Sequence, residues 1–369
     1  MPVPRAERLV ALDAFRGLTV AAMILVNNPG ESAAVYRPLQ HADWNGCTPT
    51  DLIFPFFLFI TGVAIPFSLA STPGEGRAAV YARIARRALV VFALGIFLNG
   101  FPLFDWSTLR LPGVLQRVAI CYGCASLLAV ELSIALQACA AVLLVAGYWL
   151  LMTQVPVPHV GRGMLMPDAN LAAFVDNRLL HGHLLHETWD PEGLLTTIPA
   201  IATTLWGTLT GHWLRWQRPA REHVHGLMLA GGLGLAAGCV MDRVWPLNKN
   251  LWSGSFVFFT AGAALAVLGG CYWLSEVRGW RRWAAPFLAY GSNPIVAYVL
   301  SVLVAKLLYL WRITRPDGSM TYAGHYLFET VFLRFATPLD ASLLYAVAYA
   351  LVWLLVTTFL YRRRVLIKI

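Results

Sequence analysis

Apolar runs long enough to cross a lipid bilayer recur along the whole chain. A transmembrane helix needs roughly 20 mostly apolar residues to span about 30 Å of hydrocarbon. On this basis the sequence predicts an all-α fold, a polytopic membrane helical bundle of about ten transmembrane helices that forms one domain over residues 1–369. The predicted spans are Leu9–Asn28, Leu52–Ala70, Ala88–Phe104, Leu111–Val130, Leu132–Val155, Gly193–Leu214, Val224–Met241, Leu251–Leu274, Ala284–Trp311 and Ala341–Tyr361.

One predicted span carries a break near its beginning. The ninth contains Gly291-Ser292-Asn293-Pro294. Pro294 lacks a backbone N–H, so it should kink the helix and free a carbonyl. That carbonyl and the Asn293 amide then have to be satisfied inside the protein or by a ligand, because hydrocarbon offers no partner.

The basic residues give the chain an orientation, because cytoplasmic loops of membrane proteins are enriched in Lys and Arg. Sixteen of the 28 lie on one side, nine on the other and three within spans. The richer side includes both chain ends, so we predict that both termini are cytoplasmic. The loops predicted to face outward are 29–51, 105–110, 154–192, 242–250 and 312–340.

Composition supports a membrane protein and argues against other classes. The chain is 58% hydrophobic and only 13% charged, whereas soluble domains are about one quarter charged. The net charge of +9 could indicate nucleic acid. The arginines, however, lie at predicted helix ends, and no basic stripe with interleaved aromatics lies on a soluble face. We therefore expect the lipid bilayer, and no nucleic acid, as a partner.

Two patterns that resemble metal or redox sites are weak. Cys121 and Cys124 share one face of a predicted helix without a second ligand pair, which favours packing. The stretch from His181 to Glu187 holds three histidines, but their spacing does not match the His-Glu-x-x-His helix pattern. No metal is expected.

Three charges inside predicted spans need an explanation. Asp13 and Arg16 lie three residues apart on one helix face. They form either a structural ion pair or a site in which Arg16 meets an anionic ligand arriving from the cytoplasm. Arg117 lies well inside the fourth span, where a buried guanidinium requires a carboxylate or an anionic ligand.

The loop after the first span concentrates polar chemistry. His41 offers a base near neutral pH, and Trp44 could stack on the apolar face of a sugar. The alternative is a Trp of the interfacial belt and an Asp51 that only caps the second helix. A second polar cluster opens the eighth span from the outside with Asn248 and Lys249.

The order of these motifs resembles one family over nearly the whole chain. The motifs are Leu12-Asp13-x-Phe15-Arg16-Gly17, Val26-Asn27, His41-Ala42-x-Trp44-Asn45-Gly46, Asp51-Leu52-x-Phe54-Pro55, Gly113-Val114-Leu115-Gln116-Arg117, Asp190-Pro191-Glu192-Gly193-Leu194, Asn248-Lys249-x-Leu251-Trp252 and Gly291-x-Asn293. Together they resemble the heparan-alpha-glucosaminide N-acetyltransferase family. This is a group of transmembrane acyltransferases that includes bacterial relatives linked to N-acetylglucosamine use.

The resemblance implies an activity and a place. The family moves the acetyl group of cytoplasmic acetyl-CoA across a membrane to a glucosamine amine on the far side. Its active histidine matches His41 and its active-site asparagine matches Asn27. The resemblance further suggests a homodimer and, for the bacterial type, multi-pass insertion in the inner membrane. For the bacterial type, the resemblance implies free glucosamine, a chito-oligosaccharide or a cell-envelope amino sugar as acceptor, in preference to heparan.

The two substrates are expected to enter from opposite sides. Five of the side chains expected to hold acetyl-CoA lie on or near the cytoplasmic half: Asp13, Arg16, Arg83, Arg87 and Asn293. The sixth, Arg117, lies about a turn and a half inside the outer end of the fourth span. Those expected to bind the amino sugar are in the outer loops: Asp43, Trp44, Asn45, Asp51, Asn248 and Lys249. His41 would act as general base or as acetyl acceptor, and the sequence leaves both open. The alternative function is an inner-membrane permease for N-acetylglucosamine or a related sugar. Against it, no carboxylate lies in the middle of a span to couple proton flow.

Overall fold

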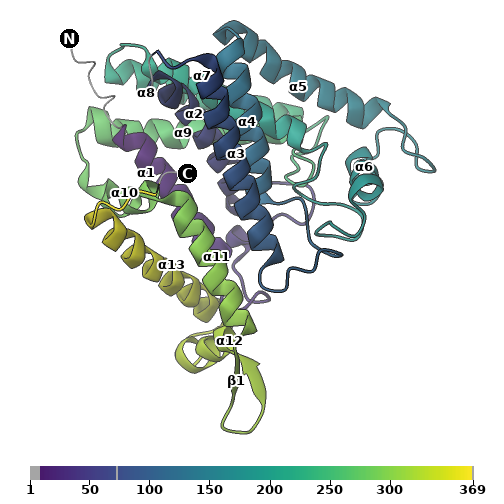
Figure 1. The fold of residues 1–369 in the computed structure, drawn as a ribbon, viewed down its shortest axis with the longest axis vertical. Coiled ribbons are helices and arrows are strands. Elements are labelled where there is room, and N and C mark those ends of the chain that lie inside the picture. The colour runs from purple at the N-terminus through teal and green to yellow at the C-terminus, as the bar shows by residue number, and fades with distance from the viewer. Residues whose placement is uncertain (1–8, 72–73, 368–369) are drawn as a thin grey trace.

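The computed structural model describes residues 9–71 and 74–367 as a helical bundle with one short hairpin (Figure 1). The α-helices in this part of the chain are α1 Val10–Val26, α2 Ile53–Ala70, α3 Arg77–Gly100, α4 Val114–Glu131, α5 Ile134–Gln154, α6 Leu171–Leu180, α7 Thr197–Arg215, α8 Ala220–Met241, α9 Gly254–Tyr272, α10 Ala285–Ser292, α11 Pro294–Leu310, α12 Ala323–Leu327 and α13 Pro338–Arg362. Strands β1 Arg312–Thr314 and β2 Met320–Tyr322 pair antiparallel. Short 3-10 turns cover Arg37–Leu39, Pro49–Leu52 and Arg282–Ala284, and π-helical turns cover Trp273–Val277 and Phe328–Phe332.

Each of the ten predicted spans coincides with helix in the structure. By length and composition, six single helices of the described chain are apolar enough to cross a membrane, and the bent pair α10–α11 makes a possible seventh. The other three predicted spans correspond to α1, α3 and α7. Helix α1 has only 17 residues, and α3 begins with a segment containing four arginines. A multi-pass membrane bundle is thus supported, while the number ten and the location of the termini stay predictions.

The predicted kink at Pro294 is confirmed. The axes of Arg282–Ser292 and Pro294–Leu310 differ by 71°. The Asn293 amide is satisfied inside the protein, by the backbone of the C-terminal tail. Its Nδ2 atom donates to the Val365 carbonyl over 2.8 Å, and its Oδ1 atom accepts from the Ile367 N–H over 2.9 Å. The amide that we expected at the acetyl-CoA site therefore holds the tail.

Glycines allow the closest helix contacts in the bundle. A Cβ added to Gly17 of α1 would lie 1.7 Å from the Phe287 carbonyl oxygen of α10, and one added to Gly62 of α2 would lie 1.9 Å from the Thr204 carbonyl oxygen of α7. Small residues let helix backbones approach in this way where lipid provides no hydrophobic drive. The first contact packs α1 closely against α10, and the second packs α2 closely against α7.

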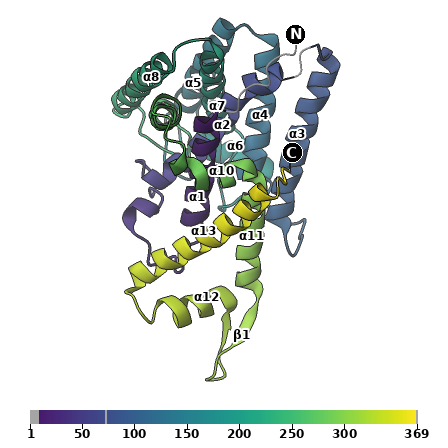
Figure 2. The same ribbon diagram turned by 90° about the vertical axis from the view of Figure 1, so that its left-hand side faces the viewer.

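The long outer loops contain structure that was not predicted. Helix α6 lies within the loop 154–192, where the Asn170 side chain caps it by accepting from the Ala173 N–H over 2.8 Å. The loop 312–340 forms the hairpin and α12, which lie together at one end of the molecule beyond α11 and α13 (Figures 1 and 2). The hairpin turns at Asp317-Gly318, with Gly318 at φ +84°, a conformation that favours glycine.

Contacts among the predicted outer loops place all five on one side of the bundle. The Trp44 indole N–H donates to the Leu165 carbonyl over 2.9 Å, and the Gly46 N–H donates to the Leu247 carbonyl over 2.7 Å. The Arg110–Asp190 ion pair joins the loop 105–110 to the loop 154–192, and the Tyr36–Asp340 hydrogen bond joins the loop 29–51 to the loop 312–340. The relative sidedness in the prediction is therefore correct, and which side faces the cytoplasm remains a prediction.

Candidate active site

The loop that carries His41 folds around a buried carboxylate. Asp51 is 1% exposed. Its Oδ2 atom accepts from the Ala42 N–H over 3.1 Å, the Thr48 N–H over 3.0 Å and the Thr48 hydroxyl over 3.1 Å. Thr48 and Asp51 form a capping box at the start of Pro49–Leu52, so the capping role considered for Asp51 is real. These bonds leave the second oxygen, Oδ1, available for another partner.

That partner is His41. Its Nδ1 atom lies 2.7 Å from Asp51 Oδ1, while the imidazole side chain is 51% exposed. An ionised carboxylate only accepts hydrogen bonds, so Nδ1 carries the proton and Nε2 keeps its lone pair. The arrangement presents a basic nitrogen at the protein surface with its ring orientation held from below.

Lys249 completes the cluster from a different loop. Its Nζ atom lies 3.1 Å from His41 Nδ1, 3.3 Å from His41 Nε2 and 3.7 Å from Asp51 Oδ1. Burial lowers the pKa of Lys249, although the nearby charges of Glu192 and Asp51 act in the opposite direction. Two loops about 200 residues apart in sequence thus bring a base, a carboxylate and an amine together. The catalytic role expected of His41 and the sugar-binding role expected of Asp51 and Lys249 stay predictions.

The neighbouring predicted residues have more structural roles. The Asn248 amide donates to Asn45 Oδ1 over 3.1 Å, while its oxygen accepts from the Leu251 N–H over 2.8 Å. Trp44 packs edge-on against Trp189 at 5.1 Å between ring centroids. Asp43 is exposed beside them. The Asn248–Asn45 bond ties the Lys249 loop to the His41 loop and thereby positions the cluster.

Asn27 lies at the C-terminal end of α1 and is exposed. Within residues 9–71 and 74–367, no described contact joins it to His41. Its predicted catalytic role therefore depends on the resemblance alone.

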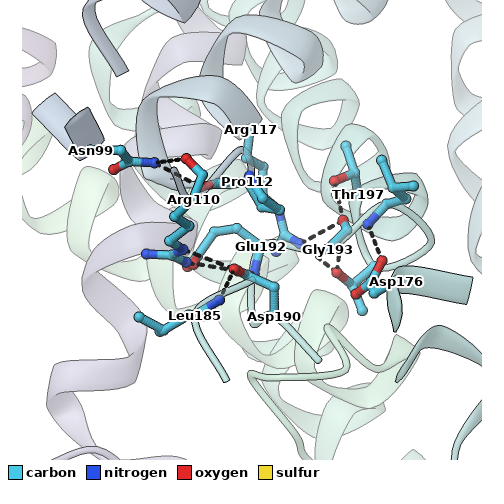
Figure 3. A network of polar contacts seen from close by, with 12 residues as sticks. Asn99, Arg110, Pro112, Arg117, Asp176, Leu185, Asp190, Glu192, Gly193 and Thr197 are labelled. Carbon is cyan, nitrogen blue, oxygen red and sulfur yellow. Dashed lines mark hydrogen bonds and ion pairs between the residues drawn. The ribbon is translucent and has the colours of Figure 1, made fainter. Parts of the chain in front are cut away.

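A second polar network, next to this site, was missed from the sequence (Figure 3). Arg110 donates to both oxygens of Asp190, over 2.8 and 2.7 Å, and to Glu192 over 2.5 Å. The two carboxylates raise the pKa of Arg110, although burial alone would lower it. From the sequence, Asp190-Pro191-Glu192 entered as part of a motif of the family resemblance, with no partner assigned to it. A signal was available, because an Asp-Pro-Glu triplet and an arginine both lie in predicted outer loops.

Arg117 and Asp176 occupy the inner part of this network. Arg117 is 1% exposed. It donates to the Gly193 carbonyl over 3.3 Å and to the Thr196 hydroxyl, and its guanidinium lies 5.1 Å from the Trp252 ring centroid. These are a carbonyl, a hydroxyl and an aromatic face, while the Nε and Nη1 atoms of Arg117 are buried without a hydrogen-bond partner among the described residues. The expected carboxylate or anionic ligand therefore stays a prediction. Burial raises the pKa of Asp176 to about 6.

An arginine-lined cavity of about 470 Å³ lies near the other end of α2. Arg16, Arg83 and Arg87, which we expected at the acetyl-CoA site, all line it, together with Arg86. Arg117 and Asn293 are not among the lining residues in the described chain. Arg16 pairs with Asp13 over 2.9 Å, so the expected ion pair is present. Arg16 also lines the cavity, and its contact with an anionic ligand stays a prediction.

The cavity runs along α2 toward His41. Its lining residues on this helix extend from Ser68 to Phe57, a helical rise of about 16 Å. Phe57 is six residues from Asp51, which adds about 9 Å. The lining changes along this path, from arginines, Ser68 and Ser292 at one end to Phe57, Val91 and Val118 further in.

The three histidines from His181 to His186 do not converge. His181 bonds Asn177 over 2.8 Å, His183 bonds the Leu109 carbonyl over 2.8 Å, and His186 stacks on Trp189 at 4.1 Å. Each ring therefore has a partner of its own.

The fold and the two sites together define a multi-pass helical membrane protein with polar chemistry near both ends of one central helix. Residues 8–236 match the family model of heparan-alpha-glucosaminide N-acetyltransferase, catalytic, and the chain belongs to this family. It is 27% identical to human heparan-alpha-glucosaminide N-acetyltransferase over 429 aligned positions, covering 98% of this chain and 60% of the human protein. It is 29% identical to the mouse protein of the same name, over 80% of this chain and 53% of that protein. The chain thus spans between half and two thirds of the length of these relatives.

Proposed function

We propose that this protein is a transmembrane acetyltransferase. It transfers the acetyl group of cytoplasmic acetyl-CoA to the amine of a glucosamine-type sugar on the periplasmic side of a bacterial inner membrane. One observation carries the proposal: the His41–Asp51–Lys249 cluster and the arginine-lined cavity lie along the same helix, near its two ends. This arrangement suits a reaction whose two substrates approach from opposite sides.

The cavity suits acetyl-CoA as donor. Guanidinium groups bind phosphates through charge-assisted hydrogen bonds. Arg83 and Arg86 lie at the polar end, and the lining becomes apolar toward Phe57. The phosphates would bind the arginines, and the pantetheine arm would follow the apolar lining so that the thioester approaches His41.

His41 would supply the base. A glucosamine amine is largely protonated near neutral pH and cannot attack until it loses a proton. The Nε2 atom of His41, which keeps its lone pair and lies 3.3 Å from Lys249 Nζ, takes that proton, and Asp51 stabilises the imidazolium that forms. The amine nitrogen then bonds to the thioester carbonyl carbon, the C–S bond breaks, and the CoA thiolate leaves and is protonated. In the alternative sequence, Nε2 attacks first and the acetyl group rests on His41 before the amine takes it.

The acceptor class follows from the chemistry on the outer side. Asp51 and Glu192 place negative charge near Lys249, and an amino sugar is a cation until it is deprotonated. We propose free glucosamine, a chito-oligosaccharide or a cell-envelope amino sugar as acceptor, and a homodimer as the assembly.

The test uses purified protein in liposomes, with labelled acetyl-CoA on one side and glucosamine on the other. Acetylated glucosamine, formed only when both substrates are present on their proper sides, supports the proposal. Flux of N-acetylglucosamine across the membrane without any acetyl transfer would overturn it in favour of a permease.

A further inference from the structure

An apolar groove on the membrane-facing side of the bundle is separate from both sites above. It has a volume of about 550 Å³ and is formed by α7, α8 and α9. Trp213 and Gly226 line it near the α7–α8 connection, and Trp206, Ala237 and Phe258 line it deeper in the bundle. On α8 it extends from Gly226 to Ala237, a rise of about 16 Å. That length matches one leaflet of hydrocarbon, which is about 15 Å thick.

The end of the groove near the α7–α8 connection is positively charged. Arg215, Arg218 and Arg221 are all exposed there. The Arg218 guanidinium lies 4.9 Å from the ring centroid of Trp213, which is itself a wall of the groove. One carboxylate is also present, because Glu222 pairs with Arg218 over 3.2 Å. The cluster therefore keeps an excess of positive charge.

A buried donor near the same end lacks a partner. The Nε1 atom of Trp213 is buried and has no hydrogen-bond partner among the described residues. An indole N–H only donates, and a buried Trp usually has an acceptor for it. The indole nitrogens of Trp206, Trp245, Trp283 and Trp353 are buried without a partner in the same way, so this donor alone does not identify a ligand.

We propose that this groove binds one anionic phospholipid. An acyl chain lies along α8, and the phosphate contacts the cluster of Arg215, Arg218 and Arg221. Clusters of basic residues beside a membrane span attract anionic headgroups in this way. A second copy of the chain is a poorer occupant. A two-fold interface would bring the same arginines of both copies together, with like charges opposed.

The test is native mass spectrometry of the detergent-purified protein after addition of dioleoyl phosphatidylglycerol or dioleoyl phosphatidylcholine. These two lipids share their chains and differ in headgroup charge. We expect one phosphatidylglycerol per chain, retained in preference to phosphatidylcholine. Ala230→Trp fills the groove and should abolish retention. Ala236→Trp is the matched control, because Ala236 lies exposed on the same helix but does not line the groove.

A second variant tests the headgroup contact without filling the groove. Changing all three arginines to Gln should reduce the preference for phosphatidylglycerol by about tenfold to a hundredfold, with an unchanged melting temperature. Equal retention of the two lipids by the parent protein would overturn the proposal. So would equal retention by the Ala230→Trp and Ala236→Trp proteins, or dissociation of a dimer by Ala230→Trp without loss of lipid.

Discussion

Asp51 holds His41 from beneath: the carboxylate is buried, the imidazole is half exposed, and 2.7 Å separates Oδ1 from Nδ1. The two residues have different roles in the proposed base. His41 presents the lone pair, and Asp51 fixes the tautomer that makes it available.

His41→Ala should reduce acetyl transfer by at least about 10²-fold, because general-base catalysis typically contributes about 10² to 10⁴-fold. The variant should remain folded and still bind CoA. Asp51→Asn should reduce acetyl transfer less than His41→Ala does, though still by at least about tenfold, because the wrong tautomer of His41 becomes accessible. Steady-state transfer to glucosamine is the measurement. Transfer that survives His41→Ala within a few-fold would reduce His41 to a loop residue.

Arg86→Gln should raise the KM for acetyl-CoA by about tenfold to a hundredfold, the range expected for one hydrogen bond to a charged group. The kcat at saturating donor should change little, because the cavity arginines are remote from the thioester. Arg281→Gln is the control, since Arg281 pairs with Glu276 on the same predicted side but does not line the cavity. Equal KM values for the two variants would contradict the donor assignment.

Asp176 makes the stability of the protein depend on pH. Burial raises the pKa of its carboxyl from 3.8 to about 6. Between these values the folded protein binds a proton that the unfolded chain has released, so the free energy of unfolding falls as pH rises through this window. Asp176→Asn mimics the protonated form. The melting temperature of this variant should depend less on pH between about pH 4 and pH 6 than that of the parent protein. At pH 7 the variant should melt at the same temperature as the parent or at a higher one.

Asp43→Asn is the matched control for that experiment, because Asp43 is exposed. It should leave the slope of melting temperature against pH unchanged. A melting temperature several degrees below the parent at pH 7 for Asp176→Asn, with the slope retained, would show that the ionised carboxylate is required.

The absolute topology can be tested with an exposed thiol on the His41 loop. Cys47 is a poor reporter because burial raises its thiol pKa to about 12, and the thiolate is the reactive form. Asp43→Cys, in a protein without its natural cysteines, should react with a membrane-impermeant maleimide in intact spheroplasts. Labelling that requires lysis would place His41 in the cytoplasm and reverse the orientation predicted from the charges.

The predictable features were those written in short stretches of sequence. The apolar runs located the helices of the bundle, and Asn293-Pro294 located the break between α10 and α11. His41 and Asp51 are ten residues apart, so their association could be proposed from one loop. Helix α6 was missed because a search for spans of about 20 residues passes over a ten-residue helix.

Tertiary pairings could not be predicted in the same way. Arg110 meets Asp190 across 80 residues. Both residues lie in predicted outer loops, but a single sequence does not show which charges of those loops pair. Arg117 illustrates a different limit. A buried guanidinium was expected to need a negative charge. The fold provides a carbonyl, a hydroxyl and the Trp252 ring, and it leaves the Nε and Nη1 atoms without a hydrogen-bond partner among the described residues. The sequence indicated the need for a partner, and the described residues supply only part of it.

The continuous course of α2 has a consequence for donor choice. In the proposed reaction, the number of turns in this helix sets the distance between the arginines and His41, and the donor must be long enough to cover that distance. A thioester on a much shorter carrier, such as S-acetylcysteamine, could not occupy both ends at once. Adding one turn to α2 would lengthen the gap by about 5 Å, and acetyl-CoA itself would then bind normally and fail to deliver its acetyl group.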